Sequence, residues 1–168
     1  VYDNSSIGMV FQEQEVDHPV AIYPIEHGAF EIPPQNANWR VGGVKVYDVD
    51  TYLLGMTPHT HLRGSKATYK AFYPDGTTET LLEVDKYDFN WQTSYKYKEA
   101  KVIPAGTRIE MELYYDNSET NAKEDGFNPN RAVRFGGPTT DEMDLAWIST
   151  TPVEPTKVSD AATPSAGE

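Results

Sequence analysis

The 168 residues are enough for one domain with a substantial core, and 12% aromatic content, with 11 Tyr, is too high for a disordered chain. There are 26 Asp and Glu residues against 14 Lys and Arg, a net charge of -12, which argues against nucleic acid and anionic membrane surfaces as partners. The absence of cysteine excludes disulfides, thiolate metal sites and cysteine nucleophiles. No run approaches the roughly 20 apolar residues that span a membrane.

Short apolar segments with period-two alternation follow one another from Pro19 onward, which predicts strands. Between two of them, Pro74-Asp75-Gly76-Thr77 predicts a hairpin turn, since Pro presets φ and Gly accepts a positive φ. The Gly42-Gly43 pair predicts a bulge. The predicted strands are 20–23, 29–32, 39–49, 52–61, 65–73, 78–84, 108–115 and 132–135.

Many short strands without helices between them predict an all-β fold, an antiparallel jelly-roll-like β-sandwich. Met111 shares one strand face with Ile109 and Leu113, two positions away on either side, and is assigned to the core. The polar stretch 117–130 is interpreted as a long loop, and no helix is predicted beyond a turn near 140–142.

The composition divides the chain into three parts. Residues 1–17 are an N-terminal extension, and residues 18–150 are the predicted β-sandwich. Residues 151–168 are rich in Pro, Ser and Ala, which is typical of a disordered tail or linker. We also consider that this tail lies along a partner protein as an arm. Because Val1 is not a natural start residue, we expect a processed product or a part of a longer protein.

His59 and His61 lie in the segment Met56–Gly64, at the end of the predicted strand 52–61. In a strand, alternate side chains share one face, so the two imidazoles would project side by side and suit one copper or zinc ion. The alternative is that both are simply polar strand residues. The other two histidines, His18 and His27, are interpreted as surface residues, although His27 could approach a metal if its loop folded over.

Further residues have simple structural interpretations. Asp141 and Glu142 could tune a metal, but a solvated turn explains them equally well. Trp39, Trp91 and Trp147 are most simply core or rim aromatics. Asp88, Asn90 and Asn117 are interpreted as turn residues whose side chains hydrogen-bond to the backbone.

Five segments together resemble a known family. They are Met-Thr-Pro-His-Thr-His-Leu-Arg-Gly (56–64), Tyr-Pro-Asp-Gly (73–76), Asp-Phe-Asn-Trp-Gln (88–92), Ile-Pro-Ala-Gly-Thr (103–107) and Thr-Thr-Asp-Glu-Met (139–143). Over roughly residues 5–150 the chain is similar to the C-terminal domain of the copper type II, ascorbate-dependent monooxygenases, the family of peptidylglycine α-hydroxylating monooxygenase. It is most similar to bacterial versions, which also occur beside redoxin or cytochrome c domains.

The resemblance implies a copper site. In this family each of two β-sandwich domains holds one copper, and the second domain uses a His-x-His strand and a Met from an Asp-Glu-Met segment. Those ligands correspond to His59, His61 and Met143. Two imidazoles and a thioether favour Cu(I). The alternative for Met143 is a core methionine, and Met56, of opposite strand parity to His59, is at best a substitute ligand.

The chain also departs from the family. Nothing in the sequence corresponds to the three-histidine copper site of the other domain, so the second electron would come from elsewhere, such as ascorbate or another donor. The peptide-hydroxylating member grips a substrate carboxylate with an Arg at the position of Thr57, and uses Asn and Tyr where this chain has Leu145 and Trp147. Peptide amidation is therefore not expected.

Two functional hypotheses follow. The first is a mononuclear copper-binding domain resembling the dioxygen-binding half of a copper monooxygenase, periplasmic or extracellular, with catalytic residues left unassigned and a separate redox or cytochrome c protein as a possible partner. The second is a non-catalytic accessory subunit that keeps this fold and docks, partly through its C-terminal tail, onto a larger extracytoplasmic complex.

Overall fold

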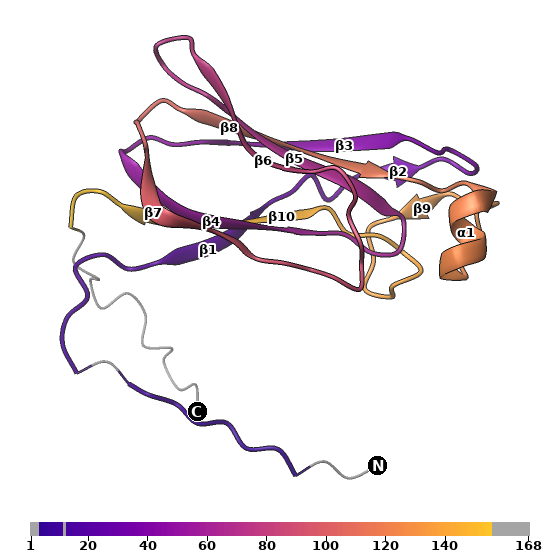
Figure 1. Ribbon diagram of the computed structural model, residues 1–168, viewed down its shortest axis with the longest axis horizontal. Coiled ribbons are helices and arrows are strands. Elements are labelled where there is room, and N and C mark those ends of the chain that lie inside the picture. The colour runs from indigo at the N-terminus through magenta and orange to yellow at the C-terminus, as the bar shows by residue number, and fades with distance from the viewer. Residues whose placement is uncertain (1–3, 12, 156–168) are drawn as a thin grey trace, which may run out of the picture.

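A computed structural model describes residues 4–11 and 13–155 as a sandwich of two four-stranded antiparallel sheets (Figure 1), which confirms the predicted all-β sandwich. A small pair of strands, β2 (Glu31–Ile32) and β9 (Val133–Arg134), lies beside them. The first sheet has the order β1 (Ala21–Ile25), β10 (Leu145–Pro152), β4 (Thr51–His59) and β7 (Tyr95–Ile103). The second sheet has the order β3 (Trp39–Val46), β8 (Arg108–Tyr115), β5 (Gly64–Phe72) and β6 (Thr78–Val84).

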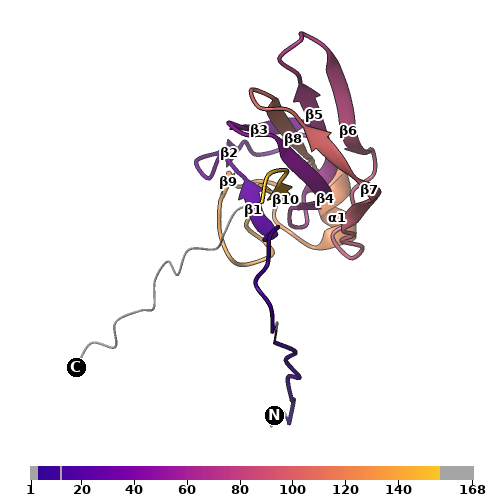
Figure 2. The ribbon, with the colours of Figure 1, turned by 90° about the vertical axis from the view of Figure 1, so that its left-hand side faces the viewer.

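The core lies between the two sheets, which face each other in the end-on view of Figure 2. The predicted alternation in β8 is confirmed, because Ile109, Met111 and Leu113 are fully buried. From the first sheet, Leu53 and Ile148 pack into the same core. Burial of a side chain of this size contributes roughly 1.5–3 kcal/mol of transfer free energy, so this packing holds the two sheets together.

The polar stretch 117–130 is not all loop, because it contains the helix α1 (Glu119–Asp125). The Ser118 side chain accepts a hydrogen bond from the Asn121 backbone N–H, and Gly126 ends the helix with a φ of 74°. Ala122 is the one residue of the seven in this helix that is buried. The helix therefore has no periodic pattern of apolar residues that could have predicted it. The Ser and Gly at the two caps were the signal available in the sequence.

The predicted bulge at Gly42 and Gly43 is wrong. Strand β3 pairs with β8 without a break there, with Gly42 opposite Glu112 and Gly43 opposite Met111. A Cβ on Gly43 would lie 3.1 Å from both Ile25 Cγ2 and Met111 Cε. The glycine therefore permits close packing of β3 against the neighbouring elements.

The N-terminal segment leaves the sandwich as an extended coil (Figure 1). At the other end, β10 continues to Pro152 and the Val153 backbone N–H donates to the Asp50 carbonyl, two to three residues beyond the predicted domain end. Most of the predicted tail, 156–168, lies outside the described residues, and so does the test of its role as an arm. In the described part of the chain no helix is long and apolar enough to cross a membrane.

Candidate metal centre

The two histidines of the His-x-His pair lie together, but not on one strand. Strand β4 ends at His59, so His61 belongs to the turn that follows, two residues beyond the end of the strand. The rings nevertheless meet edge to face, with centroids 5.3 Å apart and planes at 87°. His59 is partly exposed and His61 is 4% exposed. The strand parity expected from the sequence does not extend to His61, and the turn brings its ring to His59.

Gln92 sets the tautomer of His59. Its Oε1 lies 2.6 Å from His59 Nδ1, while its Nε2 donates to the Phe89 carbonyl at 3.0 Å. Because that second bond orients the amide with its oxygen toward the ring, His59 Nδ1 carries the proton and donates. The other ring nitrogen, Nε2, then holds a lone pair that can bind a metal.

The backbone carbonyl of Asp141 sets the tautomer of His61 in the same way. It lies 3.3 Å from His61 Nδ1, and a carbonyl can only accept. Burial lowers the pKa of His61, with the Asp141 carbonyl acting in the opposite direction and nearby His59 lowering it further. Phe89 packs edge to face against the His61 ring, with centroids 5.9 Å apart. His61 is thus held as a neutral imidazole under an aromatic cover.

Glu142 holds the backbone of this turn. Its Oε2 accepts from the His61 backbone N–H and its Oε1 from the Arg63 backbone N–H, both at 2.7 Å. The carboxyl is fully buried. Burial raises the pKa of Glu142 to about 7, against the opposing effect of these two hydrogen bonds and of the Arg63 charge. The solvated-turn interpretation of Glu142 is therefore wrong.

Arg63 is the second buried charge of the turn. Its Nε donates to Asn117 Oδ1 at 2.8 Å and its Nη1 to the Thr140 carbonyl at 2.9 Å. Its guanidinium carbon lies 3.9 Å from the centroid of the Phe127 ring. Asn117 satisfies backbone groups as predicted, since its Nδ2 donates to the Pro33 carbonyl, but it also fixes Arg63. The turn is thereby tied to three distant segments of the chain.

Only glycine fits at position 64, where this turn enters β5. A Cβ there would lie 1.7 Å from Thr60 Oγ1 and 2.9 Å from Tyr87 Cδ1. The Tyr87 hydroxyl accepts from the Thr60 backbone N–H and donates to the Thr60 carbonyl. Thr60 separates the two histidines, so these contacts fix the path of the chain from one imidazole to the other.

The structure brings the Met143 segment to the two histidines. Leu145 lies opposite His59 in the β10–β4 register, and Glu142 is bonded to His61. The Tyr115 hydroxyl donates to the Met143 carbonyl at 2.8 Å, and Met143 is partly exposed between fully buried neighbours. The backbone of Met143 is therefore held near the end of the first sheet where the histidines meet.

The remaining candidate residues lie elsewhere. The His18 and His27 residues are exposed as predicted, and His27 reaches the site only through its backbone N–H, which donates to Asp144 Oδ2 at 2.7 Å. Met56 is 3% exposed and packs in the core. Over residues 4–11 and 13–155, no group of three or more His, Cys, Asp or Glu side chains could hold a metal ion.

Sequence reasoning missed the residues that support the histidines. Asp88 and Asn90 do form the predicted turn, since Asp88 Oδ1 accepts from the Asn90 backbone N–H. Phe89 and Gln92 of the same segment contact the two imidazole rings instead. Trp91, predicted as a core or rim residue, is 77% exposed. The only signal for Phe89 and Gln92 was that they lie in one of the segments that resemble the family. Their contacts join residues about 30 positions apart, which no local pattern predicts.

Comparison with models of protein families shows to which family the chain belongs. The model of the copper type II ascorbate-dependent monooxygenase, C-terminal domain, matches residues 21–159. The chain belongs to this family. Copper is the metal of these monooxygenases, and the match includes His59, His61 and Met143. No curated protein matches the chain.

Among solved structures, the chain is similar to two structures of infectious bursal disease virus. The Gt strain structure is 14% identical with a TM-score of 0.35, over 88% of this chain and 37% of that one. The VP2 subviral particle is 14% identical with a TM-score of 0.36, over 88% of this chain and 36% of that one. The chain spans little more than a third of these proteins. Similarities at this level carry no argument about the function of this monooxygenase domain.

Proposed function

We propose that this domain binds one copper ion through the Nε2 atoms of His59 and His61 and the thioether of Met143. The observation that carries the proposal is the pair of tautomers. Both Nδ1 atoms face acceptors, Gln92 Oε1 and the Asp141 carbonyl, so both lone pairs lie on Nε2. Acceptors of this kind orient the histidine ligands of metal sites and raise their basicity.

The ligand chemistry fits copper. Two neutral imidazoles with a soft thioether favour Cu(I) over zinc, magnesium or calcium. Copper bound in this way would supply one-electron chemistry and an open position for dioxygen. The chain's own contribution is positioning: Gln92 and Asp141 orient the rings, and Phe89 shields His61 from water on one side. Glu142 holds the turn so that the imidazoles stay together.

Turnover would need an electron source besides this copper. We propose that ascorbate or a separate redox protein, such as a cytochrome c protein, donates the electron, and that the domain works in the periplasm or outside the cell.

The test is copper content, measured by mass spectrometry after reconstitution with Cu(I). We expect one copper per chain in the wild type and none in the double variant His59→Ala/His61→Ala. The matched control is His18→Ala/His27→Ala, which removes the same number of imidazoles from exposed positions and should keep the copper. Equal copper in both double variants would overturn the site, and the absence of stoichiometric copper in the wild type would overturn the copper function.

The second candidate is an accessory subunit without catalysis. It is favoured by the exposed apolar side chains of the N-terminal segment, where Ile7, Met9, Val10 and Phe11 are all more than two-thirds exposed. Surfaces of this kind mark contacts with other proteins. A protein that folds normally, takes up no copper and still associates with a larger complex would support this function over the first.

A further inference from the structure

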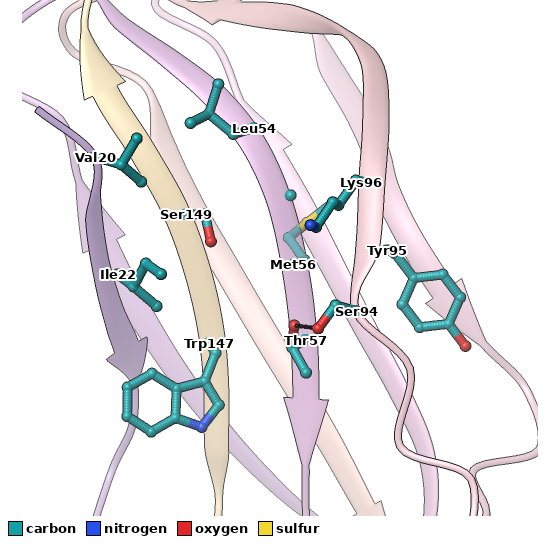
Figure 3. Close-up of a pocket in the computed structure, with 11 residues that line it drawn as sticks. Val20, Ile22, Leu54, Met56, Thr57, Ser94, Tyr95, Lys96, Trp147 and Ser149 are labelled. Carbon is teal, nitrogen blue, oxygen red and sulfur yellow. Dashed lines mark hydrogen bonds between the residues drawn. The ribbon is translucent and has the colours of Figure 1, made fainter. Parts of the chain in front are cut away.

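A groove of about 540 Å³ lies on the outer face of the first sheet (Figure 3). It crosses strands β1, β10, β4 and β7, and its volume is in the range of pockets that bind small molecules. The side chains that form its floor and walls include Val20, Ile22, Leu54, Thr57, Trp147 and Ser149.

The lining of the groove is apolar with a few hydroxyls. Ile22 is 65% exposed although it is a large aliphatic residue, which a soluble protein rarely leaves uncovered next to other apolar side chains. The Thr57 hydroxyl donates to the Ser94 hydroxyl at 2.9 Å, and Ser149 also lines the groove. Among the described residues that line the groove, Lys96 alone is charged. In a chain of net charge -12, the absence of carboxylates from this lining favours a ligand without positive charge.

The groove leads to the candidate copper site. In the pairing of β10 with β4, Trp147 lies directly opposite Thr57, and Leu145 lies directly opposite His59. The groove and His59 therefore lie along the same two strands. Thr57 precedes His59 by two residues, which places the two side chains on one face roughly 7 Å apart along the strand. Lys96 of β7 lies opposite Gly55, which precedes Thr57 by two residues and is therefore farther from His59.

We propose that this groove binds a neutral, mainly apolar small molecule, with an aromatic or aliphatic body against Trp147 and Ile22 and one end toward His59. The inference rests on the proposed copper function, since it makes the bound molecule the substrate presented to that site. Thr57, Ser94 and Ser149 offer hydroxyls to one polar group of such a molecule. A carboxylate held by Lys96 would lie at the end of the groove remote from the histidines.

Two fluorescent probes with the same ring system test this proposal on the metal-free protein. N-phenyl-1-naphthylamine is neutral, and 8-anilino-1-naphthalenesulfonate carries a sulfonate. We expect saturable binding of the neutral probe at one per chain and weaker binding of the anion. Trp147→Ala should weaken binding of the neutral probe by roughly tenfold, because stacking against an aromatic ring contributes on this scale. Ile22→Ser, at an exposed position that does not endanger folding, should weaken it severalfold.

The control is Trp91→Ala, which removes an exposed tryptophan outside the groove and should leave binding of the neutral probe unchanged. Undiminished binding in both groove variants would overturn the proposal, and so would tighter binding of the anion that is lost in Lys96→Ala. Copper(II) should quench the bound neutral probe in the wild type but not in His59→Ala/His61→Ala. Failure of the copper function would remove this quenching and leave metal-free binding intact, so the two failures are distinguishable.

Discussion

The outer face of the second sheet carries paired charges, whereas the groove on the outer face of the first sheet is mainly apolar. On the second sheet, opposite charges pair across the solvent-exposed face, as Arg40 does with Glu112 and Lys66 with Glu83. On the first sheet the exposed face is a groove whose lining includes one charged residue, Lys96, among those described. Pairs of charges keep an exposed sheet face soluble, whereas an uncovered apolar face marks a binding surface.

Three buried charged residues lie at the end of the first sheet where the histidines are. Arg63 follows β4, and Glu142 and Asp144 precede β10, and all three are fully buried. Burying charge costs free energy unless each group is paired and hydrogen bonded. Here Glu142 accepts from the His61 and Arg63 backbone N–H groups, and the Arg63 side chain donates to Asn117 and to the Thr140 carbonyl. Buried charges kept at that cost indicate that the path of this segment, which carries His61, is important. This difference supports the proposal that the outer face of the first sheet, rather than that of the second, binds a ligand.

The largest effect should come from removing a buried charge rather than an exposed one. Arg63→Ala removes the buried cation whose charge favours ionised Glu142 and leaves the buried Asn117 Oδ1 without its donor, and should lower the free energy of unfolding by about 3–5 kcal/mol. Arg40→Ala, the matched change on the second sheet, should cost less than about 1 kcal/mol, because its ion pair is exposed to solvent. Urea denaturation of both variants measures the difference, and equal losses would mean that the buried Arg63 has no special role.

A smaller effect is expected from Gln92→Ala, which removes the acceptor that orients His59. Copper affinity should fall by roughly 10–100-fold, the usual range for a group that orients a metal ligand. The unfolding free energy of the metal-free protein should hardly change, because Gln92 is exposed. Competition with a Cu(I) chelator gives the affinity, with exposed Gln14→Ala as control. Unchanged affinity would show that Gln92 does not set the tautomer.

The smallest effect on stability should come from the groove itself. Ile22→Ser should change the unfolding free energy by less than about 0.5 kcal/mol, since this side chain is already 65% exposed. Ile25→Ser, three residues along the same strand but 4% exposed, should cost several-fold more. Thermal or urea unfolding compares the two variants. A large loss with Ile22→Ser would mean that the apolar face serves the fold and not a ligand.

The sequence predicted much of the fold correctly for a local reason. Ile109, Met111 and Leu113 alternate with Glu110 and Glu112, and that alternation predicts which face of the strand is buried. The hairpin at 74–77 was equally readable, because the Asp75 side chain and Gly76 satisfy a turn within four residues. The helix at 119–125 was missed because a short capped helix with one buried residue has no periodic pattern.

By itself the sequence determined the sandwich, the family resemblance and the three ligand candidates His59, His61 and Met143, because alternation, turn residues and short motifs are read over a few neighbouring positions. Only the tertiary structure decided how these residues are held. The bond between Glu142 and the His61 backbone joins residues 81 positions apart, and that between Gln92 and His59 joins residues 33 positions apart. Tautomer, burial and the groove beside the histidines depend on contacts of this length, which no local pattern encodes.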